Sequence, residues 1–143
     1  MPAPEAPPWE IVEEKLTASR NYWIGTTRAN GAPHAKPVWG LWLDGALWFG
    51  SGSGSVTARN LARNPRLSMH LESGDNVVIL EGVAAAVTSG SAPGAVLSRY
   101  AQKYDMAEEE MAEGDWYRFA PSVAFTWTER DFLRTATRWR WEG

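Results

Sequence analysis

Residues 21–51, NYWIGTTRANGAPHAKPVWGLWLDGALWFGS, combine β-branched and aromatic residues with two turn dipeptides, Asn30-Gly31 and Asp44-Gly45. Such dipeptides favour two-residue hairpin turns of type I′, because their residues tolerate positive φ angles. The pattern predicts three antiparallel strands, at residues 22–28, 33–43 and 46–51. The middle strand is apolar on both faces from Val38 to Leu43, as expected when a sheet curls into a barrel and packs against a partner.

The remainder of the chain predicts further strands and a few helices. Trp9, Val12 and Leu16 recur at helical spacing after Pro8, which indicates an amphipathic surface helix. Further helices are expected at residues 55–64 and after Pro93, and further strands from 66, at 76–88, at 122–128 and at 134–141. The fold class is therefore mainly β (α+β), with about seven antiparallel strands and three or four peripheral helices.

The size of the chain indicates one domain. It has 143 residues, of which 44% are hydrophobic, so it can bury a core of its own. Residues 1–8 contain four prolines and are expected to form a disordered lead-in. We therefore expect a single domain over residues 9–143.

The composition excludes several classes of partner and site. The net charge of −3 is spread along the chain, so nucleic acid and anionic membranes are not expected partners. There are no cysteines, which excludes disulfides, thiolate metal sites and cysteine nucleophiles. The start of the chain lacks the regions of a signal peptide, and no apolar run approaches the roughly 20 residues of a membrane span. We expect a cytoplasmic location and a small-molecule ligand.

Catalytic sets that work without a cofactor are not found in the sequence. The two histidines, His34 and His70, are not spaced with carboxylates as metal ligands would be. The acidic run Glu108 to Glu110 fits a solvated helix start. We therefore predict no catalytic side chain and no metal ligand, and any redox chemistry would belong to a bound cofactor.

Residues 50–60, GSGSGSVTARN, form the most informative stretch for ligand binding. A glycine- and serine-rich loop leads directly into a predicted helix, whose first amides favour anions. Hydroxyl groups from Ser51, Ser53, Ser55 and Thr57, together with the guanidinium of Arg59, are suitable donors to a phosphate monoester. A linker that merely ends in a helix N-cap has the same composition, so both interpretations remain open.

The chain resembles the FMN-binding split barrels of the pyridoxamine-phosphate-oxidase-like family, including their flavin/deazaflavin oxidoreductase branch. The resemblance covers nearly the whole chain. It rests on NGAPH feeding PVW (30–39), ALWFGS (46–51), ARNLARNPRL (58–67), LEGVA (80–84), RYAQKY (99–104) and TRWRW (137–141). It implies an antiparallel split β-barrel and a homodimer with two equivalent cofactor sites, each lined by both subunits.

The resemblance also nominates residues for the cofactor site. The isoalloxazine ring would lie along His34 to Trp39 and near Phe49 to Ser51, the loop and helix that follow would hold the phosphate, and the last strand would approach from the partner. The nominated cofactor-binding residues are His34, Lys36, Pro37, Val38, Trp39, Ser51, Ser55, Thr57, Arg59, Asn60, Arg138 and Trp139. Asn60 has an alternative structural role, because its amide could tie the helix to a strand.

One departure from the family pattern concerns the phosphate. Many relatives have a lysine where this chain has Thr57, so the site loses a positive charge unless Lys36, Arg59 or Arg63 replaces it. The resemblance implies an oxidoreductase that uses FMN, or the deazaflavin coenzyme F420, to transfer hydride to or from a small planar substrate. The alternatives are a non-catalytic dimeric binding module for flavin, haem or another flat ligand, and a cofactor-free structural dimer.

Overall fold

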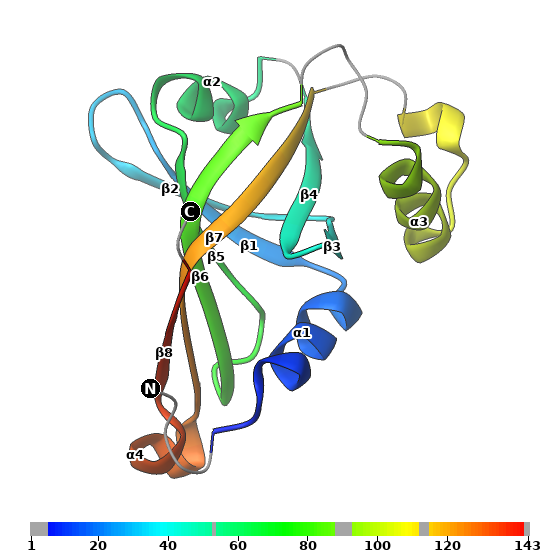
Figure 1. Cartoon of the computed structure of the whole chain (residues 1–143). Helices are drawn as coiled ribbons and strands as arrows, with labels where there is room; N and C mark the ends of the chain where they lie inside the picture. The colour runs from blue at the N-terminus through cyan, green and yellow to red at the C-terminus, as the bar shows by residue number, and fades with distance from the viewer. Residues whose placement is uncertain (1–5, 53, 88–92, 112–114, 142–143) are drawn as a thin grey trace.

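The protein folds around a single curled antiparallel sheet, shown in the computed structural model in Figure 1. The structure describes residues 6–52, 54–87, 93–111 and 115–141. Within them seven strands follow the order β2-β1-β5-β6-β7-β4-β3, and β8 pairs with β7 outside this path. The strands are β1 (Tyr22–Thr27), β2 (Pro33–Val38), β3 (Leu41–Leu43), β4 (Ala46–Ser51), β5 (Arg66–His70), β6 (Asn76–Ala86), β7 (Asp115–Thr128) and β8 (Thr137–Arg140). The predicted α+β split barrel is confirmed.

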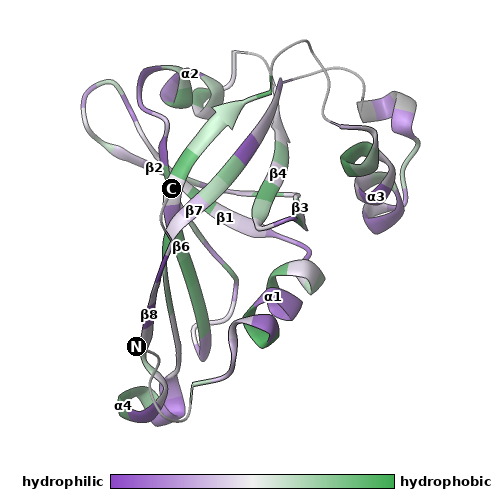
Figure 2. Cartoon of the chain, in the orientation of Figure 1, coloured by the Kyte–Doolittle hydropathy of each residue, from purple (hydrophilic) through white to green (hydrophobic). Residues whose placement is uncertain are grey.

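The helices lie around the sheet, as predicted. They are α1 (Trp9–Ala18), α2 (Val56–Arg63), α3 (Gly94–Tyr104) and α4 (Phe132–Thr135), with 3-10 turns η2 (Glu108–Met111) and η3 (Glu129–Asp131). Figure 2 shows that α1, α2 and α3 each carry both hydrophilic and hydrophobic residues, as helices that cover a core do. None of the helices in the described residues is long and apolar enough to cross a membrane.

The two hairpins differ in their turns. Asp44 and Gly45 both have positive φ angles, 54° and 73°, so the β3–β4 turn matches the predicted type I′. In the β1–β2 loop only Gly31 has a positive φ, and the Gly31 amide bonds to the Arg28 carbonyl. This loop is therefore a type I turn closed by a left-handed glycine, and the type I′ prediction was wrong here.

The predicted middle strand, residues 33–43, is two strands that meet at Gly40. β2 pairs with β1, whereas β3 pairs with β4. Gly40 lies so close to its neighbours that a Cβ there would lie 2.8 Å from Leu47 Cδ1, and its amide donates to the Tyr104 hydroxyl (2.9 Å). A side chain at position 40 would have to displace the Leu47 side chain, so glycine suits this corner.

Two hydrophobic clusters explain why the middle segment is apolar on both faces. Trp42 belongs to the main cluster inside the curled sheet, together with Leu16 and Leu47. Leu41 belongs to a second cluster under α3, formed with Val96, Tyr100, Ala101, Tyr104 and Trp116. Elements of the same chain therefore cover both faces, and this segment does not by itself require a partner.

Candidate functional site

The edge strand β2 presents two sets of side chains. His34, Lys36 and Val38 pair with Thr26, Ile24 and Tyr22 of β1, and paired residues share a face of the sheet. Because Ile24 and Tyr22 are buried in the main cluster, this first set faces the inside of the curled sheet. Pro37 lies on the opposite face and is exposed, as expected for a proline on an edge strand. Of the five nominated residues between positions 34 and 39, three therefore point inward together: His34, Lys36 and Val38.

The start of α2 is fixed by hydroxyl groups. Ser55 is the N-cap, and its Oγ accepts from the Ala58 amide (3.1 Å), the usual way of satisfying an amide in a first helical turn. Ser51, at the end of β4, places its hydroxyl 2.8 Å from that of Ser55. Strand end and helix start therefore meet through two of the nominated serines. Ser53 lies outside the described residues.

Asn60 ties α2 to the sheet. Its Nδ2 donates to Thr26 Oγ1 (3.0 Å) and its Oδ1 accepts from Arg63 (3.1 Å). The side chain is only 2% exposed, so it needs these partners. The structural role considered for Asn60 is thus observed.

Two buried polar atoms at this place have no hydrogen-bond partner within the described residues. They are His34 Nδ1 and Thr57 Oγ1. Thr57 is 1% exposed and lies three residues before Asn60, hence on the same side of α2. His34 lies directly across from Thr26, the residue that Asn60 contacts. Buried polar atoms without partners are rare in proteins, so these two atoms mark α2 and the facing part of β2 as the candidate site.

Two other nominated residues lie at the edge of this group. Arg59 is exposed, so its side chain leaves α2 on a different side from Thr57 and Asn60. Trp39 is 38% exposed, and its ring stacks on Tyr104 with centroids 4.4 Å apart. The guanidinium carbon of Arg20 lies 4.9 Å from the centroid of the Trp39 ring. Trp39 therefore forms an aromatic surface at the end of β2.

The nominated residues of β8 are not brought to this group within one chain. Figure 1 shows β8 and α2 at opposite ends of the sheet. Trp139 faces the main cluster, donates to Thr126 Oγ1 (2.9 Å) and contacts the Trp9 ring. Arg138 is exposed on the other face, across from Phe125. A role for these two residues in a partner's site stays a prediction.

The sequence did not indicate the polar cluster that lies at the C-terminal end of α3. Lys103 Nζ donates to the Tyr22 hydroxyl (2.7 Å) and to the Gly40 carbonyl (2.8 Å). Burial lowers the pKa of Lys103 to about 8, and burial raises the pKa of Tyr100 to about 12. Lys103 and Gly40 are separated by 63 residues, and no local pattern links them.

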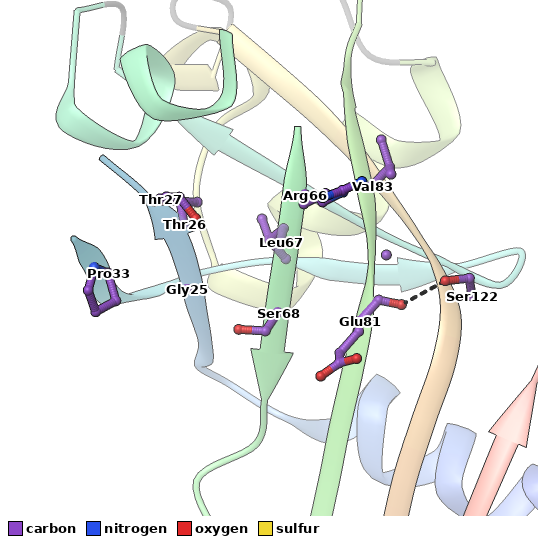
Figure 3. A pocket seen from close by; sticks show the side chains of 11 residues that line it. Gly25, Thr26, Thr27, Pro33, Arg66, Leu67, Ser68, Glu81, Val83 and Ser122 are labelled. Carbon is purple, nitrogen blue, oxygen red and sulfur yellow. Dashed lines mark hydrogen bonds between the residues drawn. The ribbon is translucent and has the colours of Figure 1, made fainter. Parts of the chain in front are cut away.

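A shallow hollow of about 480 Å³ lies on the outer face of the sheet. Figure 3 shows its lining from β1, β5 and β6, including Thr27, Arg66, Ser68 and Glu81. Gly25 lies close to Ser68, because a Cβ at Gly25 would lie 2.7 Å from Ser68 Oγ. A glycine inside a strand was the available signal for this contact. None of the nominated residues lines this hollow, and neither unpartnered buried atom belongs to it. We therefore place the candidate site at α2 and β2.

The residues at α2 and β2 suit a phosphate better than a metal ion. Hydroxyl groups, a helix N-terminus and an imidazole nitrogen are donors or potential donors to an oxyanion. Within the part of the chain that is described, no three His, Asp or Glu side chains gather as metal ligands would. The unpartnered atoms thus suit the oxygens of a phosphate better than a metal ion.

Comparisons with known proteins agree with this fold. The family model of pyridoxamine 5'-phosphate oxidase matches residues 9–128. A search of the curated proteins found no match. Among solved structures, the conserved hypothetical protein Rv2991 from Mycobacterium tuberculosis is 26% identical, with a TM-score of 0.74, over 85% of this chain and 84% of that one.

Two further structures show the same fold at lower identity. An F420 reductase is 20% identical (TM-score 0.63), over 78% of this chain and 94% of that one. HutZ, a haem storage protein from Vibrio cholerae, is 17% identical (TM-score 0.67), over 81% of this chain and 90% of that one. Because the family model spans most of the split barrel, the chain belongs to the pyridoxamine 5'-phosphate oxidase family.

Proposed function

We propose that this protein is an oxidoreductase that binds FMN or a deazaflavin and uses it to transfer hydride to or from a small planar substrate. The observation that carries the proposal is that two buried polar atoms, His34 Nδ1 on β2 and Thr57 Oγ1 in the first turn of α2, lack hydrogen-bond partners. A ligand phosphate would satisfy both atoms. The similarity to an F420 reductase supports a flavin-type cofactor over other phosphate compounds.

The proposed cofactor spans two parts of the site. Ser51, Ser55 and Thr57 would hold the phosphate, and the inward face of β2 would support the ring, with Trp39 beside its outer end. When bound, the isoalloxazine or deazaflavin ring supplies the redox chemistry, since hydride transfer belongs to the cofactor. The chain itself binds and orients the ring and keeps water from one of its faces.

We propose further that the protein works as a homodimer. The outer face of the sheet carries large apolar side chains that the chain itself covers only in part: Trp23, Val77, Ile79, Phe125 and Trp127. Phe132 is 45% exposed and Leu133 is 92% exposed beside them. A second copy would bury this surface. Arg138 lies on the same face and is the better candidate to reach a partner's cofactor, because Trp139 contacts the main cluster.

The cofactor assignment is tested by the ligand that the protein carries. Protein purified gently from its native host should release a flavin or deazaflavin, identified by absorption and mass spectrometry. The apo protein should rebind it and support its reduction and reoxidation. A purified protein that binds FMN, riboflavin and F420 no better than serum albumin would contradict the proposal.

A haem-binding module is the second candidate. The unpartnered imidazole nitrogen of His34 could ligate a haem iron, and HutZ is described as a haem storage protein. Titration with haemin distinguishes the two functions. A Soret shift in wild type that is lost in His34→Ala, without flavin binding, would favour the haem module.

A further inference from the structure

A small aromatic cavity lies beside α1, away from the candidate site at α2 and β2 (Figure 1). Its volume is about 200 Å³, several times the roughly 30 Å³ that one water molecule takes in the liquid. Three of the five residues that line it are tryptophans: Trp9, Trp42 and Trp141, with Gly45 and Pro121. Trp9 begins α1, Trp42 lies on β3 and Trp141 directly follows β8. The fold therefore brings three distant indole rings around one space.

The three rings are held in place by other contacts. Trp9 and Trp141 meet edge to face, with centroids 4.6 Å apart and planes at 62°. Trp42 is 5% exposed, and its Nε1 donates to Glu13 Oε2 (2.9 Å). Indole rings that surround one space at different angles are suited to a quaternary ammonium group, because the ring faces attract a cation and its methyl groups fill apolar space.

The surroundings of the aromatic cavity are acidic. A second hollow, of about 610 Å³, shares Trp42 and Gly45 with it. Glu13 lies four residues after Trp9 and hence on the same side of α1. Four carboxylates and one guanidinium line this second hollow: Glu10, Glu13, Glu14, Asp44 and Arg99. The excess of negative charge beside an aromatic cavity favours a cationic ligand.

We propose that this cavity binds a small free quaternary ammonium compound of the choline type. Its methyl groups would lie among Trp9, Trp42 and Trp141, and the Glu13 carboxylate would lie beside its charge. A primary ammonium would bind less well, because its N–H groups would lose water without gaining acceptors among the rings. A ligand that also carries a carboxylate or phosphate would be repelled by the acidic hollow. This inference does not depend on flavin binding at α2.

The first test compares two ligands of nearly the same shape. Choline and its neutral carbon isostere, 3,3-dimethylbutan-1-ol, are titrated into the wild-type protein by isothermal titration calorimetry. Choline should bind about tenfold more tightly, and its affinity should fall as sodium chloride is added, because a partly exposed charge is screened. Equal affinities for the two ligands, or no binding of choline, would overturn the proposal without any variant.

Variants then locate the bound choline. Trp141→Leu should weaken choline binding about tenfold, and Trp141→Phe should weaken it less. Trp127→Leu is the matched control, because Trp127 is also half-buried but does not line the cavity, and it should leave choline affinity unchanged. Glu13→Gln keeps an acceptor for Trp42 Nε1 and removes the charge. It should weaken choline about threefold and leave the neutral isostere unaffected. Circular dichroism checks that each variant is folded.

The source of the ammonium group is tested with three further probes. Glycine betaine, phosphocholine and vesicles of phosphatidylcholine should all bind more weakly than choline, because each carries a negative group next to the trimethylammonium. A peptide with trimethyllysine should also bind more weakly than choline. Tighter binding of the peptide or of the vesicles would overturn the assignment to a small free ligand. Unchanged choline affinity in both Trp141→Leu and Glu13→Gln would overturn the site itself.

Discussion

Two helices cover buried polar groups of the sheet, and they do so differently. At α3, Lys103 donates to Tyr22 and Gly40, and the Tyr104 hydroxyl donates to the Arg20 carbonyl (2.7 Å) while it accepts from the Gly40 amide (2.9 Å). At α2, both the nitrogen and the oxygen of the Asn60 amide have a partner, but Thr57 Oγ1 and His34 Nδ1 do not. The polar groups of Lys103 and Tyr104 at α3, here called the α3 corner, find their partners within the chain, whereas we propose that a ligand completes the α2 site.

This difference separates buried polar groups that stabilise the fold from buried polar groups that lack a partner in the chain. Burial alone does not distinguish the two places, because Tyr104 is 7% exposed and Thr57 is 1% exposed. The hydrogen-bond partners distinguish them. Removal of a side chain at α3 should cost stability, and removal of an unpartnered atom at α2 should cost ligand affinity but not stability.

The largest effect is expected at the α3 corner. Tyr104→Ala should lower the free energy of unfolding by about 3–5 kcal/mol, because it removes a buried ring that stacks on Trp39. Tyr104→Phe should cost about 1–3 kcal/mol, since the Gly40 amide loses its acceptor. Urea unfolding measures both. A negligible cost of Tyr104→Phe would mean that the α3 corner is not held by its polar contacts.

A positive charge at position 57 should change the ligand site in the opposite direction. Thr57→Lys should tighten FMN binding by about 1.4 kcal/mol, or tenfold, with no gain for riboflavin. Titration of wild type and variant with FMN and with riboflavin measures this difference. An unchanged FMN affinity, or an equal gain for riboflavin, would show that position 57 does not face a phosphate.

Much of the fold was predictable because its signals are local. The Asp44-Gly45 turn, the alternation of Leu67 and Met69 in β5, and the Ser55 cap of α2 each depend on neighbouring residues. The corner at Gly40 was missed because it depends on Leu47 and Tyr104, which are distant in sequence. The Asn30-Gly31 dipeptide fits two kinds of turn, and the local sequence does not choose between them.

The candidate site was predictable only in its outline. The serines around α2 and the inward set of β2 follow from strand alternation and from the family resemblance. The exposure of Arg59 and the contact of Trp139 with the main cluster depend on how α2 and β8 pack against the sheet. The same holds for the missing partners of His34 and Thr57, because a partner can be found absent only when the neighbours are known.

A smaller effect concerns the stability of the ligand-free protein. Thr57→Val should raise the free energy of unfolding by about 1 kcal/mol, since it removes a buried hydroxyl that lacks a partner. Thr26→Val is the matched control on the facing strand. It should lower stability by about 1–3 kcal/mol, because it leaves Asn60 Nδ2 without its acceptor. Equal losses for the two valine variants would contradict the distinction between the partnered hydroxyl of Thr26 and the unpartnered hydroxyl of Thr57.

The smallest effect is a pH dependence at the α3 corner. The pKa of Lys103 is lowered from 10.5 to about 8 by burial. Between these pH values the unfolded chain binds a proton that the folded chain has lost, so this group makes stability rise with pH. Because Lys103 is only half-buried, solvent screening should limit the gain to less than about 1 kcal/mol.

Comparison with Lys103→Met isolates this contribution of the lysine. The raised pKa values of Tyr22, Tyr100 and Tyr104 have the opposite effect: their unfolded forms lose protons first above about pH 10, so stability falls there. The variant retains these tyrosines, so most of their effect cancels in the difference between the two proteins. Urea unfolding at about pH 7.5, 8.5 and 9.5 should therefore show wild type gaining stability relative to the variant. Parallel curves would mean that folding leaves the pKa of Lys103 unchanged, because its bonds to the Tyr22 hydroxyl and the Gly40 carbonyl offset the loss of water.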